Sequence, residues 1–162
     1  MLRRRIWNCL VNVKFKSMYA CECGRKADLF DRWLSILLAL FSSASIGAWV
    51  FWKEHQTAWA ILLGLSQVVS VARPFVPFFK NESKFLGTSY EYDALYSRYK
   101  RLWYQLGDNP TDPSISRSLD ELGDKENEIE KHSPTFPRVK RWITKVDEAK
   151  NQAIRIDFPG TT

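Results

Sequence analysis

Two long apolar runs constrain this chain more than any other feature of its sequence. The run over 33–52 contains no charged residue, and the run over 57–79 contains only one, Arg73. At a helical rise of about 1.5 Å per residue, about 20 residues span the roughly 30 Å hydrocarbon core of a bilayer. Only Lys53-Glu54-His55-Gln56 separates the two runs, so the sequence predicts an antiparallel helical hairpin across a membrane.

A hairpin buried in a globular core is the alternative interpretation of these runs. Core helices rarely continue for about 20 residues without a charge on any face. Aromatic residues also mark the ends of the runs, as at Trp33, Trp52, Trp59 and Phe79. Tryptophan gathers at membrane interfaces because its ring is apolar and its N–H group needs a hydrogen-bond partner. The aromatic positions therefore favour the membrane interpretation.

Basic residues predict the orientation of the hairpin. Three arginines occupy 3–5, and Lys80 and Lys84 follow the second run, whereas the short loop carries only Lys53. Because cytoplasmic segments of membrane proteins carry an excess of Lys and Arg, we expect both termini in the cytoplasm. The net charge of +6 follows from this orientation and requires no nucleic-acid partner.

The remainder of the chain is expected to be helical. An amphipathic helix is predicted over 1–32, a transmembrane hairpin over 33–79 with spans 33–52 and 57–79, and a cytoplasmic helical region over 80–162. No segment alternates with period two for long enough to predict a strand. The predicted fold class is an all-α membrane protein, in which a two-helix transmembrane hairpin joins an amphipathic N-terminal helix to a C-terminal cytoplasmic helical layer.

A stripe of aromatic and apolar side chains follows a break expected at Gly87. The stripe repeats at spacings of three and four up to Leu106, which predicts an amphipathic helix that ends at Gly107. The aromatic rings of the stripe could stack on a nucleobase, and the basic residues between them could bind phosphate. Packing of the stripe on another helix or subunit is the competing interpretation. The residues predicted for a partner or ligand surface are Tyr92, Tyr96, Arg98, Tyr99, Arg101 and Trp103.

Small and polar side chains within the two runs suggest contacts between helices. Small residues let helix backbones approach closely, and polar groups at membrane depth face protein or water. The predicted helix-contact face is Ser35, Ala39, Ser43 and Gly47. The predicted pore or gate residues are Gln67, Ser70 and Arg73. Alternatively, the small face closes the hairpin within one chain and Arg73 reaches the membrane surface.

The sequence carries no signature of catalysis. It contains no nucleophile elbow, P-loop, paired-histidine metal motif or glycine-rich dinucleotide loop. Cys21-Glu22-Cys23 resembles half of a zinc site, but the chain has no second cysteine pair, and His55 and His132 lie far from it in sequence. The acidic residues over 120–130 are typical of a solvated helix face. We therefore predict that the protein is not an enzyme and holds no metal or cofactor.

The order of these parts resembles the SLATT family of two-transmembrane effector domains from bacterial conflict systems. The resemblance covers nearly the whole chain, from Arg25-Lys26-Ala27-Asp28 through Gly64-Leu65-Ser66 to the aromatic helix with Arg98-Tyr99. It rests on architecture and pattern rather than on an invariant motif.

This resemblance implies an effector of antiphage or nucleotide-signalling defence in the bacterial inner membrane. Such an effector oligomerises through its transmembrane helices and forms a pore or disrupts the membrane when a second messenger or partner protein triggers it. The implied partners are membrane lipid, further copies of the chain, a cyclic nucleotide, and a separately encoded nucleotidyltransferase, reverse transcriptase or sensor protein. A non-conducting membrane anchor or scaffold for a cytoplasmic partner and a holin-like lysis protein are the alternatives.

Overall fold

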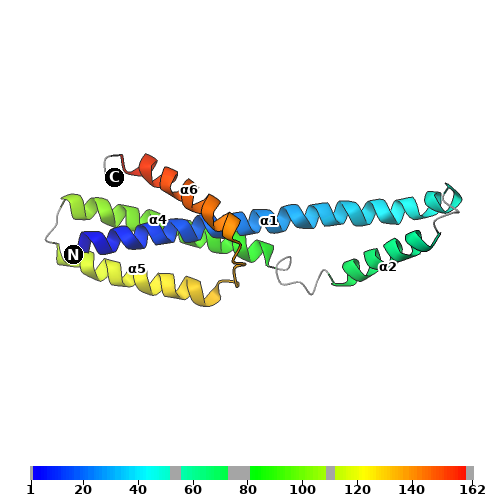
Figure 1. Ribbon diagram of the computed structural model, residues 1–162. Coiled ribbons are helices and arrows are strands. Elements are labelled where there is room, and N and C mark those ends of the chain that lie inside the picture. Colours follow the sequence, from blue (N-terminus) through cyan, green and yellow to red (C-terminus); the bar gives the residue numbers. More distant parts are fainter. Residues whose placement is uncertain (1, 52–55, 73–80, 109–111, 160–162) are drawn as a thin grey trace. The chain divides into compact units, whose positions relative to one another are not determined.

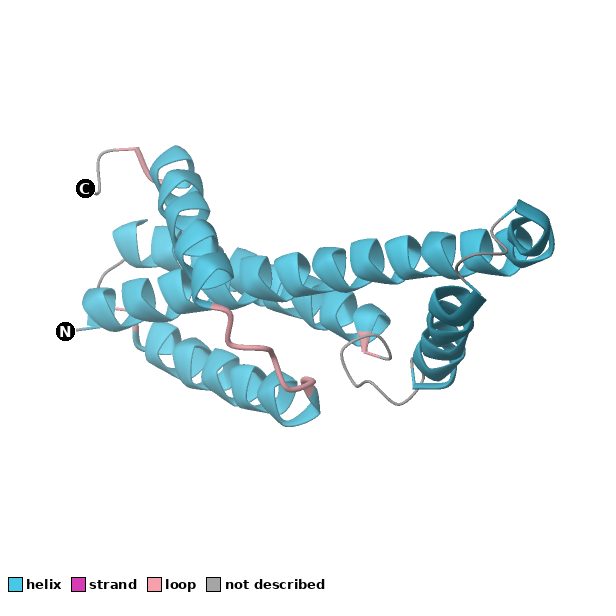
Figure 2. Cartoon of the chain, turned by 45° about the vertical axis from the view of Figure 1, so that its right-hand side comes forward, coloured by secondary structure: helices cyan, strands magenta, loops and turns pink. Residues whose placement is uncertain are grey.

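Helices account for almost all of the residues that the computed structural model describes, which are 2–51, 56–72, 81–108 and 112–159 (Figure 1). Within these ranges, the side chains of 41–51, 56, 58–60, 62 and 63 are not described. The helices are α1 (Leu2–Phe51), α2 (Gln56–Ala72), α4 (Glu82–Asp108), α5 (Pro113–His132) and α6 (Lys140–Asp157). No described residue lies in a strand, as the colouring of Figure 2 also shows.

The predicted membrane-spanning hairpin is wrong. Over the described residues, no helix combines the length and the apolar composition that crossing a bilayer requires. The first apolar run belongs to α1, a 50-residue helix that begins at Leu2. The described part of helix α2 has 17 residues.

Two predictions that depended on this hairpin are corrected with it. The predicted fold class was an all-α membrane protein, and the described helices do not provide its two transmembrane spans. The predicted location was the bacterial inner membrane with both termini in the cytoplasm. That location depended on the same spans, so it is withdrawn for the same reason.

The chain divides into two compact units that do not follow the order of the sequence. Unit 1 contains Met1–Gly24 and Ser83–Thr162, and unit 2 contains Arg25–Glu82. Helix α1 contributes its first part to unit 1 and its remainder to unit 2. The predicted boundaries at 32 and 79 were drawn from composition, which does not reveal that residues so far apart in sequence form one body.

Unit 1 is built around one hydrophobic core. Figure 1 shows α4, α5 and α6 beside the first part of α1. Helices α1, α4 and α5 contribute apolar side chains spaced mostly by three or four residues, and Ile154 of α6 and the following Phe158 complete the core. The core residues are Ile6, Leu10, Val13, Tyr92, Leu95, Tyr96, Tyr99, Leu102, Leu106, Ile115, Leu119, Leu122, Ile154 and Phe158. Burying one such side chain contributes about 1.5–3 kcal/mol, so this core outweighs the ion pairs around it, at about 0–1 kcal/mol each.

The start of α5 follows from its local sequence, whereas the start of α4 does not lie where the sequence predicts. Helix α5 starts at Pro113, where the Asp112 side chain caps it by accepting a hydrogen bond from the Ser114 backbone N–H at 2.8 Å. The break expected at Gly87 is wrong, because α4 runs through this residue from Glu82. Burial of the neighbouring Thr88 and Ser89 within unit 1 offsets the low helix propensity of glycine.

Two isoleucines of unit 1 provide a matched test of this core. Ile6 is 0% exposed, whereas Ile156 is 75% exposed. Ile6→Ala should lower the free energy of unfolding by about 2–5 kcal/mol because it removes buried methyl groups and leaves a cavity. Ile156→Ala should lower it by about 0.5 kcal/mol or less. Urea denaturation followed by circular dichroism measures both values, and equal losses would contradict this core.

Candidate interaction surface

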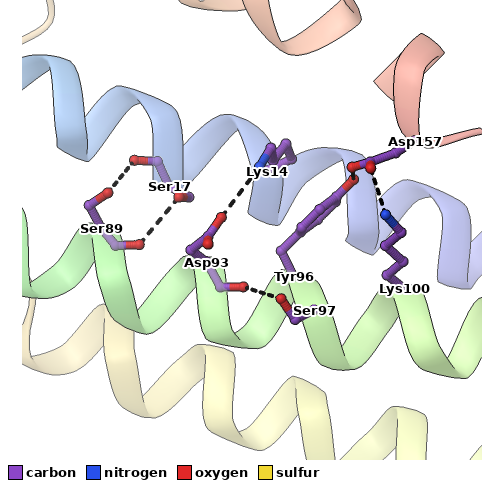
Figure 3. Close-up of polar contacts among 8 residues, drawn as sticks. All are labelled: Lys14, Ser17, Ser89, Asp93, Tyr96, Ser97, Lys100 and Asp157. Carbon is purple, nitrogen blue, oxygen red and sulfur yellow. Dashed lines mark hydrogen bonds and ion pairs between the residues drawn. The ribbon is translucent and has the colours of Figure 1, made fainter. Parts of the chain in front are cut away.

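Helices α1 and α4 of unit 1 approach each other closely along a row of small residues. The Ser17 hydroxyl donates to the Ser89 carbonyl at 3.2 Å, and the Ser89 hydroxyl donates to the Ser17 carbonyl at 3.0 Å (Figure 3). Near one end of this row, a Cβ atom added to Gly24 would lie 2.7 Å from Leu86 Cδ2. The small-residue contact that the structure describes therefore joins α1 to α4 inside unit 1.

Charged groups continue this contact along the two helices. Lys14 Nζ lies 3.3 Å from the Asp93 carboxylate and 4.4 Å from the centroid of the Tyr96 ring. Farther along, Arg3 lies over the Trp103 ring, 5.0 Å from its centroid. Residues nearer the N-terminus of α1 thus contact residues nearer the C-terminus of α4, so the two helices pack antiparallel.

Asp157, at the end of α6, ties that helix to α4. Its carboxylate accepts hydrogen bonds from the Tyr96 hydroxyl at 2.6 Å and from Lys100 Nζ at 2.5 Å (Figure 3). Burial alone would raise the pKa of Asp157, but the hydrogen bonds from Lys100 and Tyr96 outweigh burial and lower it. Burial, and then the nearby Asp157 carboxylate, raise the pKa of Tyr96, which therefore stays a neutral donor at physiological pH.

Helix α5 is tied to α1 through Lys16. Lys16 Nζ lies 2.7 Å from the Glu126 carboxylate and 2.5 Å from the Glu130 carboxylate. Burial opposes the charge on Lys16, but the two carboxylates outweigh that effect and raise the pKa of its ammonium group. Two residues of the acidic segment that was interpreted as a solvated face therefore have a structural role in unit 1.

The residues predicted for a partner or ligand surface do not share one surface. Tyr92, Tyr96 and Tyr99 are buried in the core of unit 1, and Trp103 is half-buried. The Trp103 ring packs against Trp7, with 5.0 Å between ring centroids. The two remaining residues of the set, Arg98 and Arg101, are exposed.

The residues predicted for helix contact and for a pore are only partly within the described side chains. Ser35 is half-buried, and its hydroxyl donates to the Asp31 carbonyl at 2.8 Å, whereas Ala39 is exposed. Gln67 and Ser70 are exposed on α2. The side chains of Ser43 and Gly47, and the whole of Arg73, lie outside the described residues.

Exposed apolar side chains dominate what is described of unit 2. Ala27 is the one buried residue among the described side chains of this unit. Large apolar residues on both α1 and α2 are exposed, including Trp33 at 60% and Val71 at 66%. The exposed set is Leu29, Phe30, Trp33, Ile36, Leu37, Leu40, Ile61, Leu65, Val68, Val69 and Val71. We call these residues the apolar faces of unit 2.

The spacing within the apolar faces has the form of a helix-packing seam. Leu29, Trp33 and Ile36 on α1 are separated by four and then three residues. Ile61, Leu65 and Val68 on α2 have the same separations, which were not singled out in the sequence. Alternating spacings of three and four place residues in one line along a helix, as in coiled coils.

The described residues provide little for metal or thiol chemistry. No three His, Cys, Asp or Glu side chains lie together in a way that could hold a metal ion, within the ranges that the structure describes. Cys23 is buried, and burial raises the pKa of its thiol to about 12. At physiological pH this thiol is therefore protonated and unsuited to act as a metal ligand or nucleophile.

Comparison of the chain with protein-family models, curated proteins and solved structures finds no match. The resemblance to the SLATT family therefore stays a prediction from the sequence, and the function below is argued from the described residues.

The Asp157 contacts predict an acid-sensitive contribution to stability. Because the folded state lowers the pKa of Asp157, its contribution is present above the unfolded pKa of about 3.9 and disappears as the pH falls through the folded pKa. Asp157→Asn should lower the melting temperature at pH 7, and the difference from wild type should shrink near about pH 3. Thermal unfolding followed by circular dichroism at the two pH values measures this.

Asp147→Asn is the matched control for this pH effect. Asp147 lies on the same helix and forms a local ion pair with Lys150, three residues away, at 2.5 Å. Its replacement should change the melting temperature less at both pH values. A difference between wild type and Asp157→Asn that is the same at the two pH values would contradict the role given to the Asp157 carboxylate.

Proposed function

We propose that this chain is a helical assembly protein in which unit 2 associates with unit 2 of a second copy. One observation carries the proposal: the apolar faces of unit 2 are exposed, while Ala27 alone is buried among its described side chains. Monomeric proteins rarely expose contiguous apolar surface on this scale, and larger patches mark interaction sites. Covering this surface removes apolar area from water, which favours association.

A second copy of the chain suits these faces because each helix already carries the pattern that its partner needs. The line through Leu29, Trp33 and Ile36 and the line through Ile61, Leu65 and Val68 share one spacing. Residues in such lines insert between four residues of a facing helix. A symmetric dimer uses the same patch on both copies, so a self-complementary apolar line is sufficient.

The apolar faces must be large enough for the free energy of their burial to exceed the cost of association. Association costs about 4–15 kcal/mol in lost translational and rotational freedom. One buried Leu, Ile or Phe side chain returns about 1.5–3 kcal/mol, so one or two exposed residues would not suffice. The faces extend over both α1 and α2, and only their combined burial offsets the cost.

In the defence setting that the resemblance implies, we propose that assembly is the active state of a non-enzymatic effector. A separately encoded partner that binds the assembled form better than the single chain would shift the equilibrium by the difference in its affinities. The pore-forming, anchor and holin-like roles depended on membrane-spanning helices, so we do not carry them forward.

Replacing two isoleucines of the apolar faces tests this function. Ile36 on α1 is 51% exposed and Ile61 on α2 is 60% exposed. The double variant Ile36→Gln with Ile61→Gln should weaken self-association at least about tenfold, because polar side chains would have to be buried in the contact. Sedimentation equilibrium of the full chain over a range of concentrations measures the dissociation constant.

Two exposed isoleucines of unit 1 provide the control. The double variant Ile143→Gln with Ile156→Gln makes the same chemical change on α6 and should leave the dissociation constant unchanged. A wild-type chain that stays monomeric at all concentrations would contradict the proposal. So would a monomeric chain that binds phosphatidylglycerol vesicles through Ile36 and Ile61, since the apolar faces would then contact lipid.

A further inference from the structure

A mostly apolar cavity of about 330 Å³ lies in unit 1, whereas the proposed assembly uses unit 2. Four aromatic rings contribute to its wall: Phe15 and Tyr19 of α1, Tyr92 of α4, and Phe136 of the segment 133–139 that follows α5. Small-molecule sites in proteins have volumes of about 300–1,000 Å³ and are lined mainly by apolar and aromatic side chains. This cavity has both properties.

Tyr19 holds the segment 133–139 against α1. Its hydroxyl donates a hydrogen bond to the Pro137 carbonyl and accepts one from the Val139 backbone N–H at 3.4 Å. The Phe136 ring packs on both sides, with its centroid 6.3 Å from that of Tyr19 and 5.4 Å from that of Phe85. Contacts within the chain therefore fix this part of the wall, so a ligand would not have to order it on binding.

Solvent reaches this cavity, because exposed residues contribute to its lining. Glu130 and Thr135 are exposed, and the Phe15 and Phe136 side chains are half-buried. Tyr19 and Tyr92, in contrast, are buried. The cavity thus connects an open rim to buried aromatic rings.

Lys16 brings a hydrogen-bond donor to the wall of the cavity. A lysine ammonium group carries three N–H donors. Within the described residues two of them are used, by Glu126 at 2.7 Å and by Glu130 at 2.5 Å. One donor is therefore left for an acceptor atom of a ligand.

Charge around Lys16 restricts the kind of ligand. An anion would face the carboxylates of Glu126 and Glu130, and a cation would lie beside the Lys16 ammonium group. Lys16 Nζ also already lies 5.7 Å from the centroid of the Tyr92 ring, where a second cation would otherwise be attracted. Like charges placed side by side are unfavourable, so the cavity favours a neutral molecule.

We propose that this cavity binds a small neutral heteroaromatic molecule, which packs against the four aromatic rings and accepts a hydrogen bond from Lys16 Nζ. Contacts between aromatic rings stabilise beyond the apolar area that they bury, and a charged donor forms a stronger hydrogen bond than a neutral one. The site lies within unit 1, so it is independent of the assembly proposed for unit 2.

Calorimetric titration of the full chain with quinoline at slightly alkaline pH tests this site, because quinoline is then neutral and its ring nitrogen is an acceptor. Quinoline should bind the wild-type chain. Phe136→Leu should weaken binding about three- to tenfold, because an aliphatic side chain replaces one aromatic contact. Phe15→Leu makes the same change on α1 and should weaken binding by a similar factor.

Indole tests the hydrogen bond from Lys16. It is close to quinoline in size, but its nitrogen is a donor and not an acceptor, so it leaves the third N–H group of Lys16 unpaired. Indole should bind about tenfold more weakly than quinoline. Equal affinity for the two compounds would overturn the contact assigned to Lys16.

Tyr90→Leu is the matched control, because Tyr90 lies on α4 and is 74% exposed. It should leave quinoline affinity unchanged, and so should Ile36→Gln with Ile61→Gln, which alters the apolar faces of unit 2. Equal quinoline affinity in wild type, Phe136→Leu and Phe15→Leu would overturn the proposal, and so would binding that only the unit 2 variant weakens. Absence of binding to the wild-type chain would overturn it as well.

Discussion

The antiparallel contact between α1 and α4 is the interaction on which unit 1 depends. Ser17 and Ser89 form reciprocal hydrogen bonds, and Gly24 has no side chain to separate the helices, so the two backbones lie close together. That approach places the aromatic and aliphatic stripe of α4 against the apolar side of α1, where α5 and α6 complete the core. Asp157 and Lys16 then fix the outer helices through hydrogen bonds and ion pairs worth far less than the core.

Helix α1 takes part in two different kinds of surface along its length. Its first part, in unit 1, buries residues such as Ile6, Leu10 and Val13 within the chain. Its continuation in unit 2 exposes Leu29, Trp33 and Ile36, for which the described residues of that unit provide no core. Unit 1 thus gains free energy by burying apolar side chains within one chain. In unit 2, the proposed association with a second copy would bury the apolar faces instead.

The sequence predicted the helical content well, but it did not predict which helix surfaces are buried within the chain and which are exposed. The spacing of three and four from Tyr92 to Leu106 located the buried side of α4, because this signal is local. The same stripe was also interpreted as a ligand surface, since a single sequence does not show that Tyr92, Tyr96 and Tyr99 meet α1 from more than seventy residues away. Uncharged length was taken as evidence for a membrane span, although it equally describes a helix with exposed apolar lines.

Amide hydrogen exchange along α1, followed by mass spectrometry at several protein concentrations, tests most directly the claim that one helix serves two purposes. Amides in residues 6–24 should be protected equally at all concentrations, because the core of unit 1 lies within one chain. Protection in residues 25–40 should rise with concentration, because association covers the apolar faces. Protection that is independent of concentration along the whole of α1 would contradict the assembly of unit 2, and weak protection of residues 6–24 would contradict the core of unit 1.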